Sequence, residues 1–176
     1  MLHPVDDDPE MASAIGRCSN NWTHAETILA WIFTSLTRTE HTIAVTVFSF
    51  FKATRTQSDV LKKLAKIAPF MTDELRERLK GLLKRYLALA EGRNQLLHNP
   101  MGRSVENQTY IMLRHSTPRL GELAYASKPI SPSEIDELSS KIRALVRDLV
   151  DLQQVIMKAQ FAPTPLADGL FSRTND

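Results

Sequence analysis

The sequence predicts a mainly all-α fold, a bundle of about four long helices with a small β-hairpin near residues 108–127. Apolar residues recur every three or four positions through most of the chain, which is the spacing of one face of an α-helix. Residues that favour helix starts and stops bound these segments. Only 6 of the 176 residues are glycine, which disfavours a turn-rich β fold.

The first predicted helix follows an acidic N-terminal segment. It begins near Ser19–Asn21, where the side chains suit the N-cap position, and ends near Thr37–Thr39. The apolar residues at helical spacing within it are Trp22, Ala25, Leu29, Ile32 and Leu36. We expect residues 1–18, which precede this helix, to form a flexible arm.

The next stretch fits two kinds of secondary structure. The alternating β-branched residues of 42–48 favour a strand. The apolar run nevertheless continues through Phe51 without a turn signal, and then joins a helical pattern that Pro69 closes. We therefore interpret residues 42–67 as helical.

The third helix has the clearest pattern. Thr72 suits its N-cap, and the two acidic residues that follow suit the positive end of the helix dipole. An apolar stripe then recurs at helical spacing through Leu75, Leu79, Leu82, Tyr86 and Leu89. The same register places Arg93 on this stripe. Pro100 disfavours helical geometry at Asn99, so the helix is predicted to end there.

A hairpin and a last helix complete the predicted fold. Residues 109–113 and 122–126 are strand candidates on either side of a turn at 117–121. The helix opens with a capping box at residues 131–134, which contains proline at the first helical position. Apolar residues then alternate steps of three and four over 135–159, which forms a heptad seam. Packing inside the domain and packing against a second subunit both fit this seam.

The length of the chain suits one domain with its own core. We expect a single helical domain at residues 19–160, followed by a flexible tail at 161–176. The only cysteine, Cys18, excludes an intrachain disulfide and a cysteine metal cluster, and it fits a reducing cytoplasm. The sequence contains no apolar run long enough to cross a membrane and no signal-peptide pattern. We expect a cytoplasmic protein without a membrane partner.

The net charge of +2 does not mark a nucleic-acid-binding protein, so any basic surface would have to be local. The basic residues on the second and third predicted helices are interpreted as solvated helix faces. They are Lys62, Lys63, Lys66, Arg76, Arg78, Lys80, Lys84 and Arg85.

Arg93 has the most informative position in the chain. Burying a charged side chain on an apolar stripe destabilises the fold unless the charge is paired or reaches a solvent-filled cleft. In one interpretation Arg93 forms a structural ion pair with Glu26 or Asp59 of a neighbouring helix. In the other, its guanidinium points into a polar cleft and binds a phosphate.

Asn94 and His98 are four residues apart and so share one edge of the apolar stripe. Histidine titrates near neutral pH, and a helix C-terminus favours its protonated form, which suits a general acid. Asn94 would orient the imidazole or hold a substrate oxygen. Alternatively, His98 is an ordinary capping residue and Asn94 an ordinary amide that faces solvent.

The segment from Arg93 and Asn94 to His98, near the end of a long helix, resembles the Arg-x4–6-His motif of the HEPN superfamily (higher eukaryotes and prokaryotes nucleotide-binding). A similar spacing from Arg17 to His24 crosses the predicted start of the first helix, and we interpret it as chance. The resemblance implies a helical bundle that is often dimeric, with two motifs facing each other. Many members are metal-independent endoribonucleases, including toxins and phage-defence proteins, whereas others only bind.

The resemblance implies that Arg93 and His98 form a catalytic pair, that Asn94 supports them, and that no cofactor or metal is needed. RNA carries its own nucleophile, the 2′-hydroxyl. Arginine matches the oxygens of the charged phosphorane, and histidine transfers protons. One histidine would have to act as both base and acid, so we expect a homodimer that brings two motifs together. The contact would form through the motif helix or through the seam at 135–159.

The expected partners are an RNA substrate and an antitoxin or other protein partner. Arg103, Arg114 and Arg119 are candidates for contacts with RNA phosphates. Two other functions fit the same fold. One is a non-catalytic helical module that binds a nucleotide or a protein, and the other is a dimeric scaffold in which Arg93 is only an ion-pair residue.

Overall fold

The structure is a computed structural model that describes residues 2–4, 8–104, 109–115 and 125–161, without the side chains of residues 2–4, 97, 98, 114, 115 and 125–127. The described chain is mainly helical, as predicted. Its helices are α1 (Pro9–Thr37), α2 (His41–Ser49), α3 (Thr54–Ile67), α4 (Asp73–His98) and α5 (Pro132–Phe161). Its strands are β1 (Leu2–Pro4), β2 (Met101–Ser104), β3 (Tyr110–His115) and β4 (Tyr125–Ile130).

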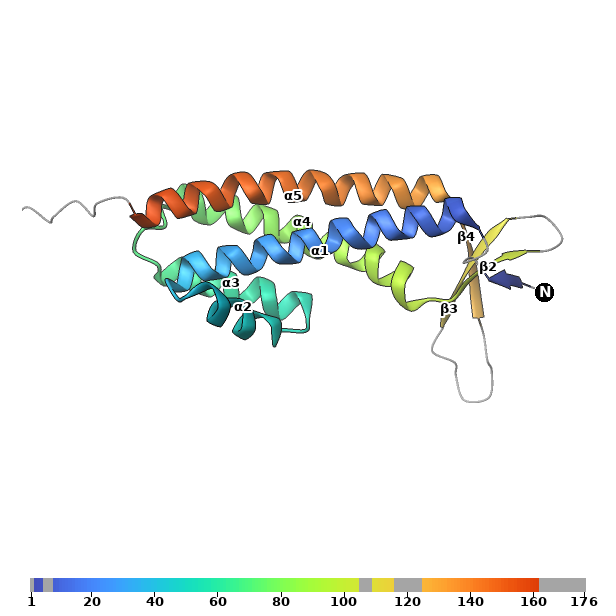
Figure 1. Cartoon of the computed structure of the whole chain (residues 1–176), viewed down its shortest axis with the longest axis horizontal. Helices are drawn as coiled ribbons and strands as arrows, with labels where there is room; N and C mark the ends of the chain where they lie inside the picture. Colours follow the sequence, from blue (N-terminus) through green and yellow to red (C-terminus); the bar gives the residue numbers. More distant parts are fainter. Residues whose placement is uncertain (1, 5–7, 105–108, 116–124, 162–176) are drawn as a thin grey trace, which may run out of the picture.

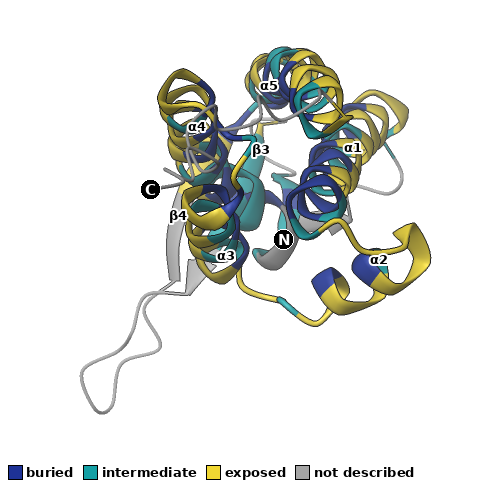
Figure 2. Ribbon diagram, turned by 90° about the vertical axis from the view of Figure 1, so that its left-hand side faces the viewer, coloured by how far each residue is buried: buried dark blue, intermediate teal, exposed yellow. Residues whose placement is uncertain are grey.

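Three long helices, α1, α4 and α5, form the body of the molecule (Figure 1). Helices α1 and α5 run in the same direction and α4 runs in the opposite one. Helix α3 packs beside the first part of α4, and the small sheet lies at the end of the bundle where α4 finishes. Viewed from the end, the buried faces of the helices turn toward a common interior (Figure 2).

Helix α1 begins well before the predicted start at Ser19–Asn21. Asp8 is its N-cap, and Asp8 Oδ1 accepts hydrogen bonds from two backbone N–H groups of the first turn, each at 3.1 Å. Pro9 occupies the first helical position, where its missing N–H costs nothing. The apolar face extends into this turn through the buried residues Met11, Ala14 and Cys18. The prediction of a flexible arm is therefore wrong for residues 9–18.

The segment predicted as one helix at 42–67 is helical but forms two helices. Helix α2 is capped by the side chain of Glu40 and ends at Ser49, and α3 begins at Thr54. The break brings Phe48 and Phe51 onto Phe33 of α1, with ring centroids 5.2 and 6.2 Å away. The alternative interpretation of a strand is wrong. The turn is favoured by these aromatic contacts, which join residues far apart in the sequence. No residue that typically forms turns marks the break in the sequence itself.

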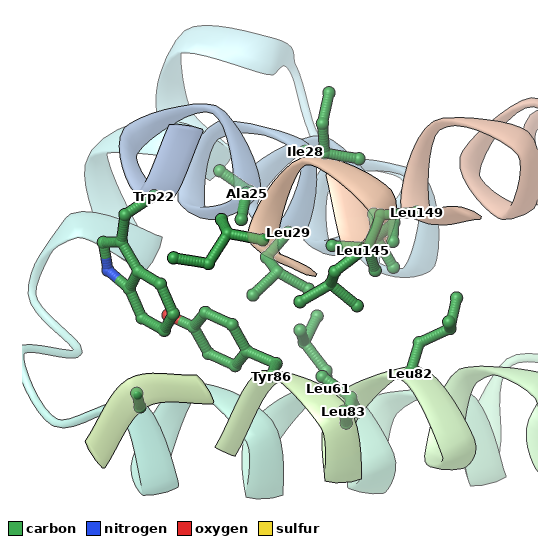
Figure 3. Packing of buried hydrophobic residues seen from close by; sticks show 14 of the residues in the cluster. Trp22, Ala25, Ile28, Leu29, Leu61, Leu82, Leu83, Tyr86, Leu145 and Leu149 are labelled. Carbon is green, nitrogen blue, oxygen red and sulfur yellow. The ribbon is translucent and has the colours of Figure 1, made fainter. Parts of the chain in front are cut away.

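Helix α4 follows its predicted course. Thr72 Oγ1 accepts the Leu75 N–H at 3.3 Å, and the helix ends at His98 before extended backbone at Asn99. Within the core, the rings of Trp22 and Tyr86 stack with centroids 4.7 Å apart (Figure 3). The Tyr86 hydroxyl donates to Gln57 Oε1 at 2.7 Å, and burial raises the pKa of Tyr86 above its usual value.

The heptad seam of α5 packs against other helices of the same chain. The predicted capping box is confirmed, because the Ser131 N–H donates to Glu134 Oε2 at 2.8 Å and the Glu134 N–H donates to Ser131 Oγ at 3.3 Å. Helix α5 packs on α1 and α4, and Figure 3 shows its seam residues Leu145 and Leu149 among their core side chains. The fully buried residues of the seam are Ile135, Ile142, Leu145, Leu149, Leu152 and Ile156. Of the two packing alternatives, the structure shows the one within the domain.

The sheet has four antiparallel strands in the order β1-β2-β3-β4. The predicted hairpin corresponds to β3 and β4, which pair from Tyr110 opposite Ile130 to His115 opposite Tyr125. Its second strand lies further along the chain than the predicted 122–126, and β1 and β2 were not predicted. The predicted turn at 117–121 and the ends of the chain at 1, 5–7 and 162–176 lie outside the described residues.

None of the helices that the structure describes combines the length and apolar character required to cross a membrane.

Asp8 also connects α1 to the sheet, which leads to a testable pH dependence. The Tyr110 hydroxyl donates to Asp8 Oδ2, and this bond, followed by the hydrogen bonds from the helix N–H groups, lowers the pKa of Asp8 below its ordinary value. The resulting stabilisation is complete above the pKa of the unfolded carboxyl and is lost as the pH falls through the lower folded pKa. Asparagine is also a good N-cap, so Asp8→Asn removes mainly the charge.

We therefore expect Asp8→Asn to be less stable than the wild type at pH 7 and to approach it in acid. Urea unfolding midpoints of both proteins at successively lower pH measure this. A difference between the two proteins that stays constant down to the acid end of the series would contradict the assigned role of the carboxylate.

Candidate functional site

Arg93 lies near the C-terminal end of α4 and contacts α1. The neighbouring Gly92 faces Leu138 of α5, since a Cβ added there would lie 3.3 Å from a Leu138 methyl. One residue further round the helix, the Cζ atom of Arg93 lies over the ring of Trp22, 5.5 Å from its centroid. Arg93 Nη1 donates a hydrogen bond of 3.0 Å to Asn94 Oδ1. A cation–π contact and a neutral amide therefore hold the guanidinium.

The predicted ion pair of Arg93 is not formed. Asp59 pairs with Lys62 at 3.5 Å, and no described carboxylate, including that of Glu26, makes a salt bridge with Arg93. Arg93 is nevertheless half-buried, so solvent screens its charge only in part. The interpretation of Arg93 as an ion-pair residue with Glu26 or Asp59 is wrong.

Two hydrogen-bond donors at this site have no acceptor. Arg93 Nε and Trp22 Nε1 are both buried and unpartnered. A buried donor without an acceptor costs about 1–3 kcal/mol, so native structures rarely leave one without a reason. The only other such side-chain atom in the described part of the chain is Ser58 Oγ on α3. The site around Arg93 thus offers a positive charge and two N–H donors that have no oxygen acceptor.

Arg17 supplies a useful contrast within the same chain. It belongs to the second, chance match of the motif spacing. Its Nε and Nη2 atoms donate to the two carboxylate oxygens of Asp136, both at 2.9 Å. A two-bond pair of this kind satisfies the guanidinium. Arg17 has a carboxylate partner and is exposed, whereas Arg93 is half-buried and has no carboxylate partner, so Arg93 is the better suited of the two to bind an anion.

At the end of α4 the Asn94 side chain accepts a hydrogen bond from Arg93, a contact that was not predicted. His98 is the last residue of the helix, but its side chain lies outside the described part of the chain. The Asn99 side chain donates to the Gln95 carbonyl at 2.8 Å and so closes the helix. No protein-family model, curated protein or solved structure matches this chain. The site is therefore interpreted from its own residues.

Trp22 is a site residue that the sequence did not reveal. It was predicted to be a core aromatic, and its side chain is only 1% exposed. Its contact with Arg93 and its unpartnered indole nitrogen depend on how α1 and α4 meet. Burial raises the pKa of the nearby Cys18 thiol, and the positive charge of Arg93 partly opposes this increase.

The basic residues of the sheet are less suited to RNA than predicted. Arg103 lies over the ring of Tyr110, 5.7 Å from its centroid, and reaches Asp8 at 3.9 Å. The side chain of Arg114 and all of Arg119 lie outside the described residues. Within the described part of the chain, no three potential metal-ligating side chains gather in one place.

Proposed function

We propose that this protein is a HEPN-type endoribonuclease in which Arg93 binds the phosphate of the bond that is cleaved. The observation that carries the proposal is the half-buried guanidinium without a carboxylate partner. A phosphate oxygen would supply the missing acceptor and the missing negative charge together. The mainly helical fold and the position of Arg93 and Asn94 before the helix end support the same proposal.

The proposed reaction uses the nucleophile of the RNA itself. The 2′-oxygen loses its proton and attacks the adjacent phosphorus, and the 5′-oxygen of the next nucleotide leaves with a proton. The products are a 2′,3′-cyclic phosphate and a 5′-hydroxyl. Arg93 stabilises the negative charge that grows on the phosphorane oxygens, and Asn94 holds the guanidinium by its Nη1 atom. His98 transfers protons.

A second copy of the chain would supply the second histidine. Because the seam of α5 is buried within the chain, the end of α4 is the contact that we propose for this homodimer. Size-exclusion chromatography with light scattering measures the state in solution. An active monomer would contradict the two-chain site while leaving Arg93 as the phosphate ligand.

The function is tested with end-labelled single-stranded and hairpin RNA in the presence of a chelator. The wild type is expected to cleave, and Arg93→Ala and His98→Ala are expected to cleave far more slowly. Equal cleavage by all three proteins would indicate a contaminating nuclease and contradict the proposal. Binding of RNA by the wild type without cleavage would instead identify a non-catalytic binding module.

Asn94→Asp tests the importance of the unpaired charge. This nearly isosteric change places a carboxylate where Arg93 Nη1 now meets an amide oxygen at 3.0 Å. The new ion pair would neutralise the guanidinium, so we expect cleavage to fall on the order of 10²-fold while the thermal midpoint does not fall. Asn94→Ala, which removes the hydrogen bond without adding charge, is the control and should lose less activity. Wild-type activity in Asn94→Asp would show that the free charge has no catalytic role.

A further inference from the structure

The hairpin formed by α3 and the first part of α4 concentrates the positive charge of the chain. From Thr54 to Arg85 it carries nine basic side chains and four acidic ones, a formal charge of +5, whereas the whole chain has +2. The two helices pack directly on each other (Figure 2). The sequence suggested separate solvated faces, but the fold places basic residues of both helices side by side.

A pocket of about 280 Å³ lies between these helices. Lys62 and Lys66 line it from α3, and Arg76 and Lys80 line it from α4. Ala65 and Leu79 supply an apolar part of the lining, and Glu77 is its one acidic residue. A pocket lined by four cations and one carboxylate favours an anionic ligand.

Three of the four cations pair with carboxylates of their own helix, among them Lys80, which pairs with Glu77 of the pocket at 3.2 Å. Arg76 pairs with Asp73 at 2.7 Å, but the Arg76 side chain is 33% exposed and the Asp73 side chain 97%. Lys62 pairs with Asp59, with 35% and 55% of the two side chains exposed. Exposed pairs within one helix are weak, so they leave these cations available to a polyanion. Lys66 makes no salt bridge with any described residue.

Arg76 is fixed in position before any ligand binds. Its Nε donates to the Ala65 carbonyl of α3 at 3.0 Å, so the side chain bridges the two helices. An arginine held in this way loses little conformational entropy when it binds a phosphate.

The pocket and the site both lie along α4. Arg76 and Asn94 are 18 residues apart, which is five turns at about 3.6 residues per turn, and Lys80 follows Arg76 by one turn. The distance along the axis is about 27 Å at 1.5 Å per residue. An extended strand of several nucleotides is long enough to span this distance.

We propose that the surface formed by Lys62, Lys66, Arg76 and Lys80 binds the sugar–phosphate backbone of single-stranded RNA, several nucleotides away from the bond that is cleaved. This inference rests on the proposed function for its choice of RNA over an acidic protein. A phosphodiester strand repeats its charge along its length, which suits a surface that presents four cations from two adjacent helices.

The test compares the double variant Lys62→Ala/Lys66→Ala with Lys141→Ala/Lys158→Ala, which removes the same charge from α5. Fluorescence anisotropy with a 2′-O-methyl RNA strand, which has no free nucleophile, measures binding apart from cleavage. A plot of log affinity against log salt is expected to become less steep by about 1.4 in the first variant, since each lost phosphate contact on a single strand contributes about 0.7. The α5 variant should keep the wild-type slope. Thermal unfolding checks that both variants are folded.

The same variants are then assayed for cleavage of long and dinucleotide RNA. For Lys62→Ala/Lys66→Ala we expect a higher KM with the long strand, an unchanged kcat, and no change with the dinucleotide. Equal slopes and affinities for the two double variants would overturn the proposal. A loss of binding as large for polyglutamate as for RNA would assign the surface to an acidic protein instead. A normal salt response without any cleavage would refute the nuclease function but not the RNA-binding surface.

Discussion

Arg93→Ala is expected to lower kcat/KM for RNA cleavage by about 10²- to 10³-fold, which is the usual effect of removing one donor that stabilises a charged transition state. The fold should survive, because the side chain has no salt bridge to lose and its Nε is a buried donor without an acceptor. Arg93→Lys keeps the charge but loses the planar fork, so it should restore only part of the activity. Steady-state kinetics and thermal unfolding of the three proteins measure both effects.

Arg17→Ala is the matched control for this prediction. Arg17 belongs to the other arginine–histidine spacing in the chain, but its guanidinium is satisfied by Asp136. We expect this variant to cleave RNA at the wild-type rate. If Arg93→Ala retained activity to within a few-fold of the wild type, or if it failed to fold, the assignment of Arg93 to phosphate binding would be wrong.

Leu149→Ala is expected to lower the free energy of unfolding by about 2–5 kcal/mol. Leu149 lies on α5, and its side chain is fully buried against the neighbouring helices (Figure 3). The truncation therefore removes apolar contacts and leaves a cavity. Because this contact lies within one chain, the loss should not depend on protein concentration. Urea unfolding at two widely separated concentrations measures it.

Val155→Ala provides the comparison on the same helix. Val155 is 40% exposed, so its truncation should change stability by no more than about 0.5 kcal/mol. A Leu149→Ala protein that dissociates into stable, folded monomers would show that the seam joins two subunits and would contradict the packing described above.

The start of α1 shows which helix signals can be recognised in the sequence and which are misleading. Asp8, Pro9 and Glu10 form a recognisable start signal, namely an N-cap, a proline at the first position and an acidic first turn. Asn21 resembled a cap but lies within the helix, where its amide donates to Ser139 Oγ of α5 at 2.9 Å. Local patterns do not distinguish a cap from a contact with a distant helix.

The long helices were predictable because their apolar spacing and caps are local properties, as at Thr72 and Ser131. The break between α2 and α3 was not, since it follows from the packing of Phe48 and Phe51 on Phe33. Strands β1 and β2 are short, and their pairing with residues far along the chain leaves no periodic signal.

For the candidate site, helix register alone placed Arg93 on the interior face of α4 and beside Asn94. Register could not show that Glu26 and Asp59 make no salt bridge with it, nor that the Trp22 indole lies next to it without an acceptor. Those facts depend on the distance between α1 and α4. The chemistry of the site is therefore a property of tertiary structure, although its residues are visible in the sequence.

The central claim, that Arg93 serves cleavage by the 2′-hydroxyl of RNA, is tested most directly with a DNA strand that contains a single ribonucleotide. In the presence of a chelator, the wild type is expected to cut only on the 3′ side of that ribonucleotide and to leave a 2′,3′-cyclic phosphate. The all-DNA strand should stay intact with both proteins, and Arg93→Ala should cut the ribonucleotide-containing strand far more slowly than the wild type. Cleavage of the all-DNA strand, or equal cleavage by wild type and Arg93→Ala, would contradict the claim.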